Sequence, residues 1–169
     1  HGPAAAWAAA AEPGDWVGVS DPGGRYRPDP TAQAHLVIGD ESALPANATV
    51  LEALGAAGAD SAGVVSAGVV SAGVPVEVFI EVADVAEEQQ LPTGAGARVH
   101  WLHRGGRPPG QPLIEAVTAA ELAPGVDPVR CQAWLSAEAG AVRDIRAHLL
   151  DERGLTRRMV YATGYWRAR

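Results

Sequence analysis

Short apolar runs alternate with amphipathic stretches along most of this chain. The apolar runs predict strands at residues 35–39, 76–83, 98–103, 130–136 and 159–163, and helical periodicity predicts helices at about 44–54, 111–122 and 139–153. Strands that alternate with helices are typical of a parallel sheet that is covered on both faces. The pattern therefore predicts an α/β fold with a doubly wound, mostly parallel, five-stranded sheet.

The first thirty residues follow a different pattern. Residues 3–11 predict a short helix, and residues 14–20 alternate between apolar and polar side chains, as a strand does. Prolines at positions 28 and 30 mark residues 25–34 as a linker. The α/β pattern begins only after this linker.

Residues 55–75 interrupt the pattern between the first helix and the second strand. Within them, the repeat Ser-Ala-Gly-Val-Val begins at Ser61 and again at Ser66. A period of five fits neither a helix nor a strand, and so few copies cannot bury the core of a solenoid. We interpret this segment as a low-complexity insertion in a loop, where added length costs little stability.

Composition narrows the functional classes. The chain of 169 residues has room for one main domain, and its net charge of −7 argues against non-specific binding of nucleic acid. Cys131 is its only cysteine, which excludes an internal disulfide and favours a reducing cytoplasm. The longest uncharged stretch, residues 61–76, is broken by glycines, serines and Pro75, so we expect no membrane span. Because the sequence also lacks an initiator methionine, we interpret it as a fragment.

The turn after the first strand predicts a phosphate-binding site. Ligands of open parallel sheets bind beyond the carboxyl ends of the strands, where the strand order reverses. If the strand order is 3-2-1-4-5, the loops after the first and fourth strands flank one crevice. The first of these loops runs through Gly39, Asp40, Glu41, Ser42, Ala43, Leu44 and Pro45 and opens a helix, whose N-terminus offers unpaired N–H groups to an anion.

The residue types in this turn have different expected roles. Gly39 would let the backbone approach a pyrophosphate, Ser42 and the N–H groups of residues 43 and 44 would donate to it, and Pro45 suits a first helical turn. Asp40 and Glu41 would repel a phosphate, so they either contact ribose or nicotinamide groups or cap the helix. The alternative is an ordinary strand-turn-helix with Asp40 or Ser42 as its N-cap.

Five motifs occur in the order seen in one protein family. They are GDESALPA (39–46), FIEVAD (79–84), WLHR (101–104), EAGAVR (138–143) and GYWR (164–167). In this order and content the chain resembles the siderophore-interacting proteins, which are FAD-dependent, NAD(P)H-using ferric-siderophore reductases. The resemblance extends over residues 1–169, interrupted by one insertion, and five ordered motifs are far more specific than a single one.

The resemblance implies a division into domains. Residues 31–169 would form a ferredoxin-reductase-like NAD(P)H-binding domain with the insertion at 55–75, and residues 1–30 would be the tail of a β-barrel flavin domain and a linker. The remainder of that barrel, with its Arg-x-Tyr-Thr/Ser flavin motif, does not occur in this sequence. FAD is therefore expected to bind mostly outside this sequence, and the nucleotide that binds within it is NADPH or NADH.

Two residues after the third strand are candidates for binding the nucleotide. Arg104 is the candidate for an adenosine 2′-phosphate, because its planar guanidinium matches phosphate oxygens and because related reductases place such a residue there. That role would favour NADPH over NADH. Arg107 competes for it, and a solvated arginine is the alternative. His103 would pair with phosphate or adenine, or be structural.

The loop after the fourth strand supplies the other side of the crevice through Ser136, Ala137 and Glu138. Glu138 and Arg143 resemble the family's A-G-E-x-x-x-V-R run, which places Glu138 near the nicotinamide. Ala137 stands where the family usually has glycine, so its methyl group would crowd a cofactor if that backbone came close or had a positive φ. Arg143 would alternatively form a surface ion pair with Glu138 or Asp144.

The C-terminal motif adds aromatic and basic candidates. Trp166 either covers a flavin ring or packs on the core, where we expect Tyr161. Arg167 and Arg169 are expected to contact a ferric siderophore, which is often an anionic chelate.

The function that the resemblance implies is hydride transfer from NAD(P)H to FAD, followed by one-electron reduction of Fe(III) in a siderophore and release of Fe(II). This chemistry belongs to the flavin, so we expect no catalytic side chain and no metal-ligand cluster. A ferric siderophore is the expected partner, rather than nucleic acid or a membrane. The alternative is a non-catalytic or degenerate nucleotide-binding domain that lacks its flavin domain.

Overall fold

A computed structural model describes residues 3–18, 26–56, 73–93 and 96–168 of the chain. Its strands are β1 (Ala34–Asp40), β2 (Val76–Val82), β3 (Ala97–His103), β4 (Cys131–Glu138) and β5 (Val160–Trp166), and its α-helices are α1 (Pro3–Ala10), α2 (Leu44–Ala56), α3 (Gln111–Ala119) and α4 (Ala139–Ala147). All neighbouring strands are parallel and their order is β3-β2-β1-β4-β5. The predicted fold class and strand order are therefore confirmed.

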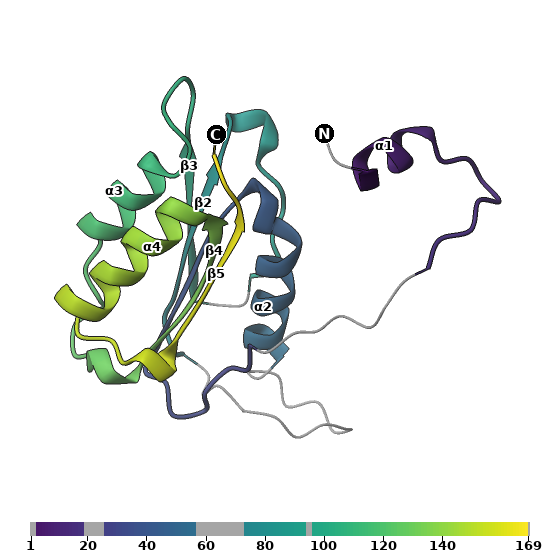
Figure 1. The fold of residues 1–169 in the computed structure, drawn as a ribbon. Coiled ribbons are helices and arrows are strands. Elements are labelled where there is room, and N and C mark those ends of the chain that lie inside the picture. The colour runs from purple at the N-terminus through teal and green to yellow at the C-terminus, as the bar shows by residue number, and fades with distance from the viewer. Residues whose placement is uncertain (1–2, 19–25, 57–72, 94–95, 169) are drawn as a thin grey trace.

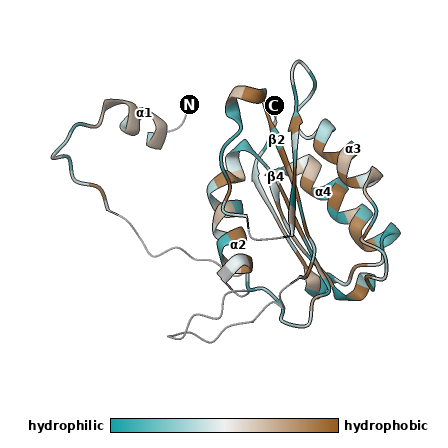
Figure 2. Ribbon diagram, turned by 180° about the vertical axis from the view of Figure 1, so that it is seen from behind, coloured by the Kyte–Doolittle hydropathy of each residue, from teal (hydrophilic) through white to brown (hydrophobic). Residues whose placement is uncertain are grey.

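Helices cover both faces of the sheet, with α2 on one face and α3 and α4 on the other (Figure 1). Side chains of the central strand β1 pack alternately on the two faces of the sheet, because successive side chains of a strand point to opposite sides. Leu36 and Ile38 pack with α3 and α4, whereas Val37 packs with α2. Strands β1, β2 and β4 are almost fully buried, as expected of the centre of a parallel sheet that is covered on both faces, and much of the sheet is hydrophobic (Figure 2).

The ends of α3 and α4 are held by a single arginine. Helix α3 ends at Ala119, three residues before its predicted end, and Arg153 donates hydrogen bonds to the carbonyl oxygens of Thr118 and Ala120 there. Helix α4 continues into a π-helical turn (His148–Glu152), and Gly154 follows with a φ of 75°. The predicted helix over residues 139–153 and its left-handed terminal glycine are both observed.

The N-terminal segment differs from its prediction. Helix α1 forms as expected, but residues 14–18 form no strand. The N–H of Asp15 instead donates to the Glu12 carbonyl, and the Asp15 carboxylate accepts from the Glu12 N–H. This turn uses backbone groups that a strand would have to pair with a neighbouring strand. The side chain of Trp16 beside it is 97% exposed.

The expected linker is partly packed against the sheet. Tyr26 meets Trp134 and Tyr161 edge to face at centroid distances of 5.5 and 5.3 Å. The Gln132 side chain on β4 accepts from the Asp29 N–H and donates to the Arg27 carbonyl. These contacts begin before the proposed domain boundary at residue 30, which stays a prediction.

Most of the repeat segment, residues 57–72, lies outside the described residues. Within the described ranges, no helix combines the length and the apolar character needed to cross a lipid bilayer.

Candidate functional site

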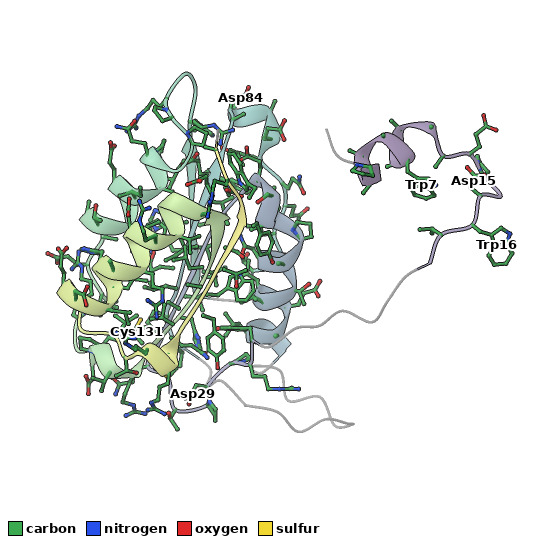
Figure 3. The ribbon with its side chains drawn as sticks, viewed as in Figure 1. Trp7, Asp15, Trp16, Asp29, Asp84 and Cys131 are labelled. Carbon is green, nitrogen blue, oxygen red and sulfur yellow. The ribbon has the colours of Figure 1, made fainter. Side chains whose placement is uncertain are left out.

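The predicted site corresponds to the carboxyl edge of the sheet, where β1 and β4 are adjacent and the strand order reverses. Asp84, just beyond β2, marks this edge in Figure 3, and Cys131, at the start of β4, marks the opposite edge. Gly39 pairs with Ser136 across the two strands. The turn after β1 and the end of β4 therefore meet, as the sequence predicted.

Asp40 joins three strands at this edge and is almost fully buried. Its Oδ1 accepts from the N–H and the hydroxyl of Ser42, at 3.0 and 2.5 Å, and so caps the following 3₁₀ turn (Glu41–Ala43). Its Oδ2 accepts from the Glu138 N–H on β4 and the Trp166 indole N–H on β5, both at 2.8 Å. The capping alternative for Asp40 is thus observed. Ser42, expected to donate to a phosphate, gives both of its donors to Asp40.

Gly39 lies in a tight polar cradle. A Cβ at this position would collide with Nδ2 of Asn47 on α2 and would lie 2.9 Å from the Ser136 carbonyl oxygen. Asn47 Oδ1 accepts from the Trp134 indole, but Asn47 Nδ2 and Ser136 Oγ are buried without a hydrogen-bond partner. Buried polar atoms normally have partners, so these two are available to a ligand that reaches the turn.

Arg104 is neither solvated nor free, which corrects the expectation of an open phosphate ligand. Its guanidinium makes a two-pronged contact with the Glu41 carboxylate, with nitrogen–oxygen distances of 2.7 and 3.1 Å, and donates to Glu81 at 3.0 Å. Burial opposes the ionisation of Glu41, but the hydrogen bonds from Arg104 outweigh it and hold the pKa of Glu41 below its usual value. The hydrogen bonds to Glu41 likewise raise the pKa of Arg104, although burial opposes this.

Glu81 is a site residue that the sequence reasoning missed. This fully buried carboxylate also accepts from the backbone N–H groups of Gly110 and Leu113, at 2.9 and 3.2 Å. Glu81 lies on β2 and so caps the N-terminus of α3 from another element of the fold. Gly110 has no side chain to cap with, and a Cβ on it would lie 2.5 Å from the Cβ of Ala141. The available signal was an acidic residue inside the apolar run of β2, where an unpaired charge would be costly.

Glu138 and its neighbours hold the end of β4. The Glu138 carboxylate accepts from the N–H groups of Gly140 and Ala141 and from the Ala168 N–H. Burial raises its pKa, but these hydrogen bonds outweigh the effect, so the pKa of Glu138 lies below its usual value. Glu138 is thus the N-cap of α4. Ala137 is fully buried in the core, so its methyl group packs inside the domain.

The remaining cationic and aromatic candidates are mostly peripheral. Arg143 pairs with Asp144, one of its expected alternatives, and Arg107 pairs with Glu115. His103 contacts Glu88 at 2.7 Å. Trp166 and Tyr161 are half-buried, so Tyr161 is not the core residue we expected. Arg167 is exposed, and Arg169 lies outside the described residues.

These groups form a binding site more than a reactive one. Cys131 is fully buried, and burial raises the pKa of its thiol to about 12, so it is no nucleophile. In the part of the chain that the structure describes, no three His, Cys, Asp or Glu side chains gather as metal ligands. The edge offers two unpaired buried polar atoms and the partly exposed Glu41 carboxylate to a polar ligand.

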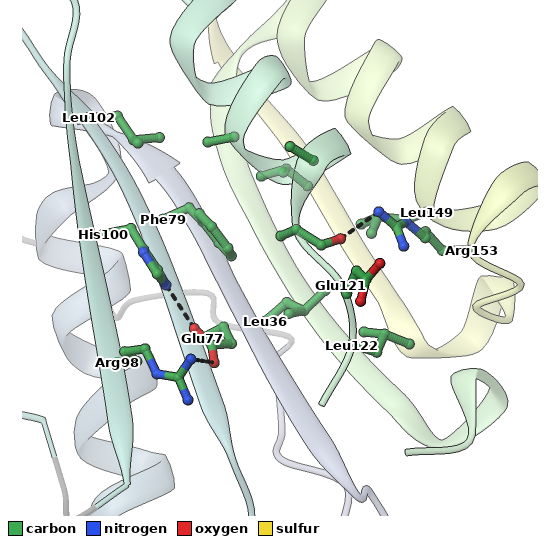
Figure 4. A pocket seen from close by; sticks show the side chains of 14 residues that line it. Leu36, Glu77, Phe79, Arg98, His100, Leu102, Glu121, Leu122, Leu149 and Arg153 are labelled. Carbon is green, nitrogen blue, oxygen red and sulfur yellow. Dashed lines mark hydrogen bonds and ion pairs between the residues drawn. The ribbon is translucent and has the colours of Figure 1, made fainter. Parts of the chain in front are cut away.

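A cavity of about 390 Å³ lies elsewhere, between β2, β3 and the end of α3 (Figure 4). The ring of Phe79 stacks on His100 at its wall, with centroids 4.7 Å apart. Glu77 on β2 accepts from His100 and pairs with Arg98, both on the neighbouring strand β3, along one wall of the cavity (Figure 4). Because these polar groups already satisfy one another, we place the candidate site at the carboxyl edge instead.

Comparisons with known proteins point to one family. A family model described as siderophore-interacting protein matches residues 32–169. An uncharacterised protein of Mycobacterium tuberculosis is 38% identical over 178 residues, and the match covers 99% of this chain and 56% of that protein. Ferric vibriobactin reductase ViuB of Vibrio cholerae is 26% identical over 168 residues, which cover 98% of this chain and 54% of ViuB.

The fold is also similar to that of solved structures. The crystal structure of a siderophore utilization protein from T. fusca has a TM-score of 0.71 and 39% sequence identity, and covers 98% of this chain and 56% of that one. The chain thus spans about half the length of these relatives.

Proposed function

This chain belongs to the siderophore-interacting protein family, and we propose that it forms the pyridine-nucleotide-binding part of a flavin-dependent ferric-siderophore reductase. The observation that supports this most directly is the cradle at Gly39. It lies at the switch point of a parallel sheet and brings together a close backbone turn and two unpaired buried polar atoms, Asn47 Nδ2 and Ser136 Oγ.

The residues of this edge suit a dinucleotide. Gly39 would admit the pyrophosphate close to the backbone at the turn into α2. Of the two N–H groups expected to donate there, that of Leu44 already donates to the Glu41 carbonyl within the turn. Asn47 would donate from Nδ2, and Ser136 would donate or accept at Oγ. Asp40 would not contact the nucleotide itself, but its hydrogen bonds hold Ser42 and the end of β4 in place.

NAD(P)H would supply a hydride and FAD would pass on its two electrons singly, so that one hydride reduces two ferric ions. We expect the flavin to bind mostly to polypeptide outside this sequence. The role of this chain is to hold the nucleotide in one orientation at the sheet edge and to exclude water there. Trp166, fixed by Asp40, would form one wall.

Positive charge near the C-terminus is the basis for the proposed binding of a ferric siderophore. A ferric siderophore that is an anionic chelate would be attracted by arginines, and the exposed Arg167 follows directly after Trp166. Arg169 is proposed for the same role. The relative ViuB, described as a ferric vibriobactin reductase, supports a siderophore substrate of this kind.

Calorimetric titration of the chain with NAD⁺ and NADP⁺ tests the proposal. Binding of either nucleotide is expected, and Gly39→Ala should abolish it by filling the cradle. Gly55→Ala, near the C-terminal end of α2 and with open space around its Cβ, is the control and should bind normally. Failure of both nucleotides to bind would favour the degenerate-domain alternative. A second assay follows Fe(II) release from a ferric siderophore with NAD(P)H and FAD present, using protein that includes the flavin-binding part.

A further inference from the structure

Three charged side chains lie in a row from the sheet edge into the protein interior, in the order Glu41, Arg104 and Glu81. The side chain of Glu41 is 34% exposed, that of Arg104 is 14% exposed and that of Glu81 is fully buried. Arg104 lies between the two carboxylates and donates three hydrogen bonds to them. The exposed end of this row of charged side chains is therefore the Glu41 carboxylate, and the Arg104 guanidinium lies deeper in the protein.

Arg104 is not free to turn toward another anion. Its inner partner, Glu81, cannot follow it, because Glu81 also accepts from the N–H groups of Gly110 and Leu113 at the start of α3. Withdrawing the guanidinium would leave a fully buried carboxylate without its cation, which is strongly unfavourable. The geometry thus keeps Arg104 beside Glu81 and Glu41.

The local charge is negative. Two carboxylates outnumber the one guanidinium, and the other basic residues at the end of β3 and on the loop after it have partners of their own. His103 contacts Glu88, and Arg107 contacts Glu115. A ribose 2′-phosphate carries nearly two negative charges at neutral pH and would meet the Glu41 carboxylate first. Such like-charge contacts cost several kcal/mol in general.

Glu41 offers a favourable contact to a different group. A carboxylate accepts hydrogen bonds and makes a good partner for the hydroxyls of a ribose, which is how acidic residues recognise NAD in doubly wound folds. The two-pronged contact with Arg104 fixes the orientation of the Glu41 carboxylate.

We propose that this site selects a nucleotide with free ribose hydroxyls, and so NADH over NADPH, with Glu41 as the specificity-determining residue and Arg104 as its positioning residue. The inference rests on the proposed function of the same crevice. It reverses the expectation from the sequence that Arg104 favours NADPH.

Competitive and direct calorimetric titrations with 5′-AMP, 2′,5′-ADP, NAD⁺ and NADP⁺ test the proposal. These probes differ only in the 2′-phosphate within each pair. In each pair, the ligand without the 2′-phosphate should bind at least about tenfold more tightly. Glu41→Gln keeps the shape but removes one negative charge, and it should reduce the tenfold ratio to near unity or invert it. Glu52→Gln, on the exposed face of α2, removes the same charge elsewhere and should leave the ratio unchanged.

The outcomes separate the two proposals. Tighter binding of NADP⁺ and 2′,5′-ADP to the unmodified chain would overturn the selectivity and leave the proposed function intact. Binding of none of the four ligands would overturn the proposed function itself. An unchanged ratio in Glu41→Gln, with a folded protein by circular dichroism, would remove Glu41 from the specificity role.

Discussion

The indole N–H of Trp166 donates a 2.8 Å hydrogen bond to Oδ2 of Asp40, although the two residues are 126 positions apart in the sequence. The same oxygen accepts from the Glu138 N–H, so one carboxylate ties together the ends of β1, β4 and β5. The shape of the candidate site therefore depends on a residue that need not touch a ligand.

Asp40→Asn should lower the free energy of unfolding by about 1–3 kcal/mol, because an amide N–H₂ would face N–H donors that now have an acceptor. Urea denaturation measures the change. Asp84→Asn is a matched control, since Asp84 is an exposed cap whose Oδ1 accepts only from the Ala86 N–H, and asparagine caps equally well. Equal stability of the two variants would contradict the importance we assign to Asp40.

Gly39→Ala should lower the free energy of unfolding by about 1–3 kcal/mol, since the new methyl group collides with Asn47 and presses on the Ser136 carbonyl. Gly55→Ala should instead be neutral or stabilising by up to about 1 kcal/mol, because nothing lies near its Cβ and alanine favours a helix. Thermal melts of both variants make the comparison. A stable Gly39→Ala would mean that the turn can open.

Glu81→Gln should lower the free energy of unfolding by about 3 kcal/mol or more, because it removes the buried charge that faces Arg104 and weakens the cap of α3. Urea denaturation, read by circular dichroism, measures the loss. Glu115→Gln is the control at an exposed partner of Arg107, and its denaturation midpoint should match that of the unmodified chain. A midpoint for Glu81→Gln that also matched would show the ion pair to be dispensable.

We expect the folded protein to lose stability in mild acid because of His35. It is fully buried, neither ring nitrogen has a partner, and burial lowers its pKa from 6.5 to about 4. Below pH 6.5 the unfolded chain binds a proton that the folded chain does not, so the free energy of unfolding falls until the pH reaches about 4. Between pH 7 and pH 5 the loss from this one group is about 2 kcal/mol.

Urea denaturation at pH 7, 6 and 5 checks this pH dependence. His35→Leu should be at least as stable at pH 7, because it removes two unpaired polar atoms, and its stability should vary less between pH 7 and pH 5. If His35→Leu kept the full pH dependence, another group would be responsible.

The strands and helices could be predicted because they are short-range features. An apolar run such as Leu36-Val37-Ile38 must be buried, and so must the apolar face of the helix predicted at residues 139–153. This holds whichever element of the fold packs against them. The prediction failed at residues 14–18, because a strand exists only where a neighbouring strand takes its hydrogen bonds, and here Glu12 and Asp15 bond with each other instead.

The sequence alone predicted a nucleotide site at the turn that contains Gly39, because this turn ends a central strand of a parallel sheet, and the site stays a prediction. It also left Asp40 correctly open between capping and ligand contact. Only the tertiary structure decided that Arg104 is enclosed by Glu41 and Glu81 and that Trp166 is anchored on Asp40. The reason is physical: the partner of a charged or polar side chain depends on strand order and register, which bring together residues that no local pattern relates.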